Sequence, residues 1–202
     1  MQQIDEIKKY AKDNYIPIMK DGGIEFICNY IKEHNVKTVL ELGTAIGYSA
    51  SEFALASPDV KITTVEIDID KCIKAIQNFS DLGLKDRITL INKDAHFLEL
   101  DEKFDLIFID AAKAQYIKFF EQFKNNLSEN GVIITDNLKF HGMVEDLSLT
   151  HNYSTKKLVK KIRKYIDFLK NNTEFSTEFF DCGDGISVSK RNSKIENTAD
   201  MN

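Results

Sequence analysis

The sequence predicts an α/β protein with a doubly wound, Rossmann-like sheet of seven mostly parallel strands, ending in a C-terminal antiparallel hairpin. Two observations predict this fold. Apolar runs of strand length alternate with segments of helical period over residues 38–135, which is typical of parallel strands joined by crossover helices. Two further strand-like segments flank Gly183-Asp184-Gly185, and this tight-turn signal favours an antiparallel hairpin.

The alternating region predicts five parallel strands, and two helices are expected to precede them. Proline breaks a helix and favours an extended residue before it, so Pro17 should separate the first two helices. The expected helices cover residues 2–14, 22–34, 47–57, 70–82 and 114–127, and the expected parallel strands cover 38–42, 61–67, 88–92, 104–110 and 131–135.

The pattern changes after the fifth expected strand. A long polar loop over residues 138–154 leads to a lysine-rich helix that ends near Leu169, and strands at 174–180 and 185–189 complete the sheet. A loop of this length is interpreted either as a lid or as a flexible connection. In doubly wound sheets, ligands bind beyond the carboxyl ends of the strands, near the reversal of strand order. Functional side chains are therefore expected at those ends.

Length and composition favour one globular domain. With 202 residues, 43% of them hydrophobic, the chain can bury a full-sized core, and we expect one domain over residues 1–191 with a disordered polar tail at 192–202. The formal net charge of -5 argues against a dedicated polyanion binder and leaves local basic patches open.

Cysteine usage and hydropathy predict a cytoplasmic protein. Cys28, Cys72 and Cys182 are far apart and form no C-x-x-C motif, which indicates free thiols in a reducing compartment. The first residues are polar and lack the apolar core of a signal peptide. No apolar run approaches the roughly 20 residues that span a bilayer, so no membrane association is expected.

The ends of the first three expected strands favour an adenosine-containing cofactor. Gly43 and Gly47 lie in the first strand–helix turn, where glycine lets a ligand approach the backbone and free helix N–H groups. Their G-x-x-x-G spacing differs from the G-x-G-x-x-G of pyrophosphate-binding turns, which disfavours NAD. Glu66 ends the second strand, where a carboxylate accepts hydrogen bonds from both ribose hydroxyls; a solvated acid is the alternative. Asp94 and Ala95 follow the third strand, where they can meet the adenine.

Polar side chains after the fourth and fifth strands favour a metal site. Asp110 follows one strand, and Asp136 and Asn137 follow the other. This oxygen-only set suits Mg²⁺ or Ca²⁺ and lacks the His or Cys of a zinc site. Asp and Asn also cap turns and helices, so capping is the alternative for each residue. Three such residues near the expected cofactor, with Lys113 close by, favour the metal.

Five motifs give the chain a resemblance to a known family. They are IPIM at 16–19, LELGTAIGYSA at 40–50, FIDAAKAQY at 108–116, GVIITDN at 131–137 and GDGISVSK at 183–190. The chain resembles, over about residues 16–190, the metal-dependent O-methyltransferases that include the caffeoyl-coenzyme A and catechol enzymes. It is similar in particular to the bacterial transfer-RNA 5-hydroxyuridine methyltransferases. The resemblance implies the class I S-adenosylmethionine-dependent methyltransferase fold.

The resemblance also implies roles for individual residues. Asp110, Asp136 and Asn137 would bind Mg²⁺ or another divalent cation, and Lys113 would be the general base or oxyanion partner at a catalytic centre that includes Asp110. S-adenosyl-L-methionine would be held at the Gly43 turn, with Asp110 touching its methionine part and with further contacts from Met19, Glu41, Ser49, Glu66, Asp94 and Ala95. A homodimer is implied too, although the chain has little sequence before its first helix, where the family often pairs subunits.

The motifs do not by themselves identify the molecule that accepts the methyl group. A divalent cation lowers the pKa of a coordinated oxygen, and both catechols and 5-hydroxyuridine offer two neighbouring oxygens. Six of the nine residues at 156–164 are basic, and the apolar ones lie on one helical face. A solvated lysine face is the simpler interpretation; a phosphate-binding surface, extended by Lys139 and His141, is the sharper one.

The resemblance favours methylation of 5-hydroxyuridine to 5-methoxyuridine at the wobble position, with the transfer-RNA anticodon loop as partner. The alternative within enzymes is a small catechol-like or caffeoyl-type metabolite as acceptor. An alternative outside enzymes is a non-catalytic nucleotide-binding module. The combination of Asp110, Lys113, Asp136 and Asn137 argues against that module, which would need no metal–lysine pairing.

Overall fold

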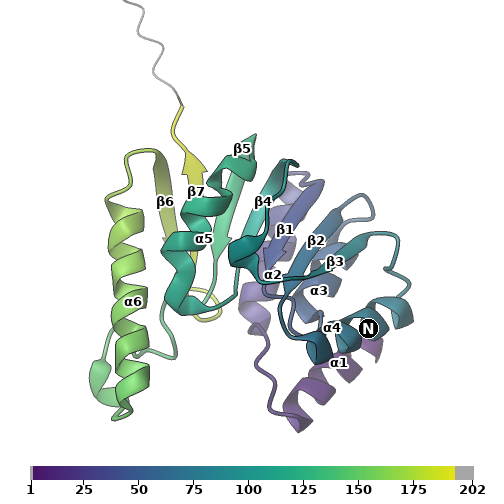
Figure 1. The fold of residues 1–202 in the computed structure, drawn as a ribbon, viewed down its shortest axis with the longest axis horizontal. Coiled ribbons are helices and arrows are strands. Elements are labelled where there is room, and N and C mark those ends of the chain that lie inside the picture. The colour runs from purple at the N-terminus through teal and green to yellow at the C-terminus, as the bar shows by residue number, and fades with distance from the viewer. Residues whose placement is uncertain (1, 194–202) are drawn as a thin grey trace, which may run out of the picture.

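A seven-stranded sheet forms the centre of the protein in the computed structural model, which describes residues 2–193. The strand order is β3-β2-β1-β4-β5-β7-β6 (Figure 1). The first five strands are parallel to one another, and β7 lies antiparallel between β5 and β6. This confirms the predicted fold class. The strands are β1 (Thr38–Leu42), β2 (Lys61–Glu66), β3 (Ile88–Asn92), β4 (Phe104–Ile109), β5 (Leu127–Thr135), β6 (Phe175–Phe180) and β7 (Ile186–Arg191).

Helices cover both faces of the sheet. One face packs against α1 to α4 and the other against α5 and α6. The helices are α1 (Gln2–Asp13), α2 (Asp21–Glu33), α3 (Tyr48–Ala56), α4 (Ile69–Asp81), α5 (Tyr116–Phe123) and α6 (Tyr153–Lys170). Short 3₁₀ turns lie at Ala95–Phe97, Lys113–Gln115, Lys124–Asn126 and Leu147–Leu149. Within residues 2–193, no helix combines the length and hydropathy that crossing a bilayer requires.

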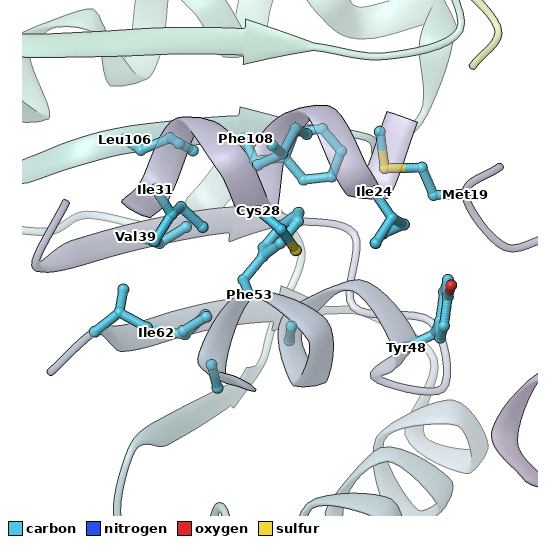
Figure 2. Close-up of a cluster of buried hydrophobic side chains, with 14 of the residues drawn as sticks. Met19, Ile24, Cys28, Ile31, Val39, Tyr48, Phe53, Ile62, Leu106 and Phe108 are labelled. Atoms are coloured by element: carbon cyan, nitrogen blue, oxygen red, sulfur yellow. The ribbon is translucent and has the colours of Figure 1, made fainter. Parts of the chain in front are cut away.

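Successive strand residues pack into two separate cores because side chains alternate between the faces of a strand. Val39 and Leu106 join the core under α2 and α3, whereas their neighbours Leu40 and Ile107 join the core under α5 and α6. Figure 2 shows the first of these cores, where the Phe53 and Phe108 rings meet edge to face with centroids 5.4 Å apart. Burying each such side chain contributes roughly 1.5–3 kcal/mol. Double-sided burial explains why these strands read as continuous apolar runs.

The strand order reverses at β1, which pairs with β2 on one side and with β4 on the other. Connections therefore leave the carboxyl ends of β1 and β4 in opposite directions, and a crevice opens between them. The residues that follow the five parallel strands all lie at this edge of the sheet. The fold thus gathers side chains that are up to about a hundred positions apart in the sequence.

One predicted element was wrong in its extent. A helix was expected over residues 114–127, but α5 ends at Phe123 and Leu127 already begins β5. Phe123 and Leu127 are both buried and lie four residues apart, so they mimic one face of a helix. Leu127 is instead paired with Phe104 of β4, just before a shift in register.

The C-terminal part largely follows the prediction. The expected loop after β5 contains a 3₁₀ turn, and α6 begins at Tyr153 with the Asn152 side chain accepting a 3.0 Å hydrogen bond from the Thr155 N–H. In the predicted tail, Asn192 bonds to the backbone of Thr173 and Glu174, and residues 194–202 lie outside the described part. The three cysteines are free.

Candidate active site

A cleft of about 680 Å³ opens at the carboxyl ends of the parallel strands. Most of the predicted site residues line it, namely Met19, Gly43, Glu66, Asp94, Ala95, Asp110, Lys113 and Asn137. Three others are buried next to this lining: Glu41 and Asp136 are 0% and 1% exposed and feel the charge of Asp110, and the buried Ser49 donates to Glu41. The structure therefore brings all the predicted site residues to one place, in two layers.

The glycine turn after β1 allows two segments of backbone to approach closely. Gly43 has φ +107°, and a Cβ there would lie 2.7 Å from the carbonyl oxygen of Asp110. Gly47 has φ +80°, and a Cβ there would lie 2.5 Å from the Phe79 ring. Only glycine tolerates a positive φ without strain and has no Cβ to clash with these neighbours. The turn is thereby held against the end of β4, which brings Asp110 beside the predicted cofactor turn.

Backbone N–H groups fix the carboxylate of Glu66. One oxygen accepts from Ala45 at 2.9 Å, and the other accepts from Ile67 and Asp68 at 2.9 and 3.0 Å. A carboxylate has about four acceptor sites, so capacity remains for hydroxyl donors in the cleft. This geometry suits the predicted role of Glu66 in binding a ribose.

Asp94 is held by a residue that the sequence analysis left without a role. Its Oδ1 accepts from the N–H of His96 and contacts the His96 Nδ1, both at 2.9 Å. The hydrogen bond from the His96 N–H lowers the pKa of Asp94. His96 also lines the cleft. This contact could have been predicted from the sequence, because an aspartate before a turn commonly accepts from the N–H two residues later.

Glu41 belongs to a chain of buried hydroxyl groups under the cleft. Its two carboxylate oxygens accept from Ser49 Oγ and Thr64 Oγ1, each at 2.5 Å, and Thr64 Oγ1 lies 2.6 Å from Thr44 Oγ1. Burial raises the pKa of Glu41 to about 7, although both hydroxyl donors act in the opposite direction. Thr44 and Thr64 were not predicted, because their contact with Glu41 depends on the pairing of β1 with β2.

Asp136 is a buried acid with one oxygen that makes no hydrogen bond within residues 2–193. Its Oδ1 atom is buried and has no hydrogen-bond partner in the described part of the chain. Burial and the neighbouring charge of Asp110 raise the pKa of Asp136 to about 7. Burial also raises the pKa of Asp110, while Lys113 lowers it. A buried carboxylate oxygen without a hydrogen-bond partner costs free energy, so this arrangement suits a cation.

Lys113 lies between the other two candidate ligands. Its Nζ donates to Asn137 Oδ1 and lies 3.4 Å from Asp110 Oδ1. Among residues 2–193, no three His, Cys, Asp or Glu side chains are grouped so as to hold a metal ion. The candidate set is therefore two carboxylates and one amide, and a divalent cation would need the ammonium group to move away from Asn137.

The basic face of α6 is exposed and free of ion pairs. Lys157, Lys160, Lys161 and Lys164 are exposed, and none lies within 4.0 Å of a carboxylate in the described residues. In contrast, Lys139 pairs with carboxylates, among them Asp181 at 2.5 Å. Three residues of the predicted apolar face of α6 are buried, Val159, Ile162 and Leu169. The other two, Leu158 and Ile166, are half-buried, and Tyr165 is buried as well.

Comparisons with known proteins identify the family. The sequence profile of the O-methyltransferase family matches residues 1–192. The caffeoyl-CoA O-methyltransferase of Populus kitakamiensis is 25% identical over 91% of this chain and 82% of its own length. The match to an Arabidopsis thaliana relative, a candidate caffeoyl-CoA O-methyltransferase, is 29% identical over 69% of this chain and covers 62% of that relative.

Solved structures agree in fold. A candidate caffeoyl-CoA O-methyltransferase from Staphylococcus aureus superimposes with a TM-score of 0.89 and 34% identity, covering 94% of this chain and 92% of the other. An O-methyltransferase from Bacillus cereus in complex with SAH has a TM-score of 0.80 at 22% identity, covering 95% and 91%. These findings confirm the predicted methyltransferase fold and the predicted enzyme class, an O-methyltransferase. The chain belongs to the O-methyltransferase family.

Proposed function

We propose that this enzyme binds S-adenosylmethionine in the cleft and transfers its methyl group to a hydroxyl of 5-hydroxyuridine, at the wobble position of transfer RNA, with the help of a divalent cation. The unpartnered buried Oδ1 of Asp136, in a carboxylate close to Asp110 and Lys113, carries the proposal for the cation. The unpaired lysines of α6 carry the proposal for RNA. The homodimer implied by the resemblance stays a prediction.

The cofactor would extend along the cleft from β3 to β4. The adenine would contact Asp94 and Ala95, and the ribose hydroxyls would donate to Glu66, whose carboxylate is already oriented. The methionine part would lie toward Asp110 and Met19, above the Glu41–Ser49 pair. Support comes from the related fold that binds SAH in the Bacillus cereus protein.

The oxygen atoms of Asp110, Asp136 and Asn137 fit a hard cation such as Mg²⁺. When bound there, the cation would lower the pKa of an acceptor hydroxyl and orient it. The role of the chain is then to hold the acceptor oxygen in line with the S–CH₃ bond and to exclude water. The Lys113 Nζ contacts Asn137 and Asp110 in this structure and would move away from Asn137 when the cation binds. As an ammonium it would stabilise the developing oxyanion, and as the free amine it would take up the hydroxyl proton.

Replacing Lys113 with methionine is expected to lower turnover at neutral pH by about 10²–10⁴-fold, the usual loss when a general acid–base group is removed. Turnover of the variant should rise with pH more steeply than that of the native enzyme, because the acceptor must then ionise without the lysine. Methyl transfer from labelled S-adenosylmethionine across a pH series measures both effects. Lys118→Met, an exposed position on α5, is the matched control. Near-native turnover of Lys113→Met at neutral pH would rule out the proposed role.

The exposed α6 lysines favour RNA over a small acceptor. A metabolite needs only the cleft, whereas an anticodon loop presents phosphates around the flipped or unpaired base. The helix α6 packs against the Lys113–Gln115 turn, and its unpaired lysines would contact those phosphates and make binding salt-dependent. The names of the plant and Staphylococcus aureus relatives support the second candidate, a caffeoyl-type or catechol-like acceptor.

Charge reversal of α6 distinguishes the two acceptors. Lys157→Glu with Lys161→Glu is expected to raise KM for transfer RNA at least about tenfold and to reduce the salt dependence by about one unit of slope for each lost phosphate contact. Methylation of a catechol should be unchanged. The control is Lys61→Glu with Lys85→Glu, two exposed lysines near the amino ends of β2 and β3, at the opposite edge of the sheet.

The direct test is methyl transfer with and without Mg²⁺, to transfer RNA bearing 5-hydroxyuridine and separately to a catechol. Metal-dependent labelling of the RNA alone supports the proposed acceptor. Labelling of the catechol alone overturns the RNA assignment and supports the second candidate. Equal labelling with a chelator present and with Mg²⁺ contradicts the proposed cation.

A further inference from the structure

The turn between β6 and β7 contains a buried carboxylate that the proposed chemistry does not use. Asp184 is only 3% exposed. Its Oδ1 accepts from Lys20 Nζ at 3.0 Å, and its two oxygens accept from the backbone N–H of His141 at 3.0 and 3.1 Å. Lys20 immediately precedes α2, and His141 lies in the loop after β5. One carboxylate therefore bridges three segments that are distant in sequence.

Backbone contacts on both sides hold this turn in place. A Cβ at Gly183 would lie 3.1 Å from the backbone of Gly23, and a Cβ at Gly185 would lie 3.0 Å from the backbone nitrogen of Lys139. The N–H of Lys139 donates to the Asp184 carbonyl at 2.8 Å. The turn is thus wedged between the start of α2 and the start of the loop, which leaves little room for Asp184 to move.

The loop that Asp184 binds has an unfavourable backbone conformation. Asn137, Phe140 and His141 all have positive φ, at +62°, +45° and +57°. Residues with a Cβ adopt this region only at a cost in free energy, so contacts outside the loop must stabilise it. The two hydrogen bonds from the His141 N–H to Asp184 are such contacts, and they act at the last of these three residues.

Both segments that Asp184 joins line the cleft. Ile18, Met19 and Lys20 form part of one wall, and Phe140 and His141 form part of another. We propose that Asp184 is a positioning residue that ties these two walls together and so sets the shape of the acceptor end of the cleft. The proposal rests on the cleft being the reaction site of this O-methyltransferase, and it is independent of the acceptor and of the metal.

Amide hydrogen exchange tests the bridge without any assay of activity. In Asp184→Ala, exchange across residues 138–146 and 16–24 is expected to be at least about tenfold faster than in the native protein, as in local opening of a segment that has lost its contacts. Asp184→Asn should restore part of the protection of 138–146, since an amide oxygen still accepts from His141. The matched control is Glu178→Gln, because Glu178 is an exposed acid of β6 that makes no ion pair with either segment among the described residues and should leave exchange unchanged.

Lys20→Met keeps the test decisive if Asp184→Ala does not fold. This variant removes the ion pair between Asp184 and the half-exposed Lys20 and leaves the hydrogen bonds from His141 in place. Exchange should therefore increase in 16–24 more than in 138–146. In kinetics, Asp184→Asn should raise KM for the acceptor several-fold more than KM for S-adenosylmethionine. Native-like exchange in both the Asp184 variants and Lys20→Met would overturn the proposal. Because exchange needs no substrate, that result differs from a wrong acceptor, which would change the methylation assay alone.

Discussion

Asp136→Asn is expected to lower Mg²⁺-dependent methyl transfer by at least about a hundredfold, since a metal that polarises the reacting oxygen supplies several kcal/mol of transition-state stabilisation. Asp136 is the most buried of the three candidate ligands, and its Oδ1 has no partner among the described residues. An asparagine keeps the shape of the side chain and removes the charge that would attract the cation. Initial rates at several Mg²⁺ concentrations measure the loss.

Thermal stability provides a readout of the cation that is independent of activity. A ligand that binds only the folded state at 100 times its Kd stabilises by about 2.7 kcal/mol, which corresponds to a rise of roughly 5–10 °C in Tm for a chain of this size. Mg²⁺ should therefore raise the Tm of the native protein and not that of Asp136→Asn. The exposed Asp101→Asn is the matched control and should respond like the native protein. An equal rise in Tm for Asp136→Asn would place the cation elsewhere.

Glu41→Gln is expected to weaken S-adenosylmethionine binding by about ten- to a hundredfold, because a hydrogen bond to a charged group is worth about 1.5–3 kcal/mol. In the proposed complex, the methionine part lies over the Glu41 carboxylate, which accepts from its cationic amino group with its remaining acceptor capacity, while Ser49 and Thr64 hold its orientation. Calorimetric titration of the cofactor measures the change. Glu33→Gln, an exposed position at the end of α2, is the control. Unchanged affinity would contradict the proposed contact.

The same substitution should change how stability depends on pH. Burial raises the pKa of Glu41 from its ordinary value near 4.5 to about 7, so the folded state binds a proton more tightly than the unfolded state. The stability that this group contributes is therefore fully present below about pH 4.5 and is lost as the pH rises through about 7. The loss is roughly 3 kcal/mol.

Urea unfolding of the cofactor-free protein at pH 5 and pH 8 measures this effect. The native protein should lose more stability between these two values than Glu41→Gln does, and the variant should be the more stable of the two at pH 8. Comparing the two proteins removes the contributions of the other titrating groups. Parallel stability profiles for the two would mean that Glu41 is ionised without cost in the folded state.

Local patterns in the sequence predicted the sheet, because each parallel strand is a short run rich in apolar or β-branched residues, with a polar residue or glycine at its end. That rule predicted β1 and β3 with their observed bounds and predicted that Asp110, Asp136 and Asn137 would share one edge. It was misleading at Leu127, whose helical spacing from Phe123 concealed the start of β5. The spacing of apolar residues shows which positions are buried. Over a stretch as short as one helical turn, the same spacing occurs in a buried helix and in a buried strand.

The sequence by itself determined the fold class, the strand ends and the residue types at the candidate site, since these depend on neighbours in the chain. Only the tertiary structure decided which of those residues face the cleft and which lie below it. The raised pKa of Glu41, the unpartnered Asp136 oxygen and the bridge from Asp184 to Lys20, 164 positions away, all depend on burial and on contacts between distant segments. Those contacts arise only when strand register and turn geometry bring the segments together, and no local pattern encodes them.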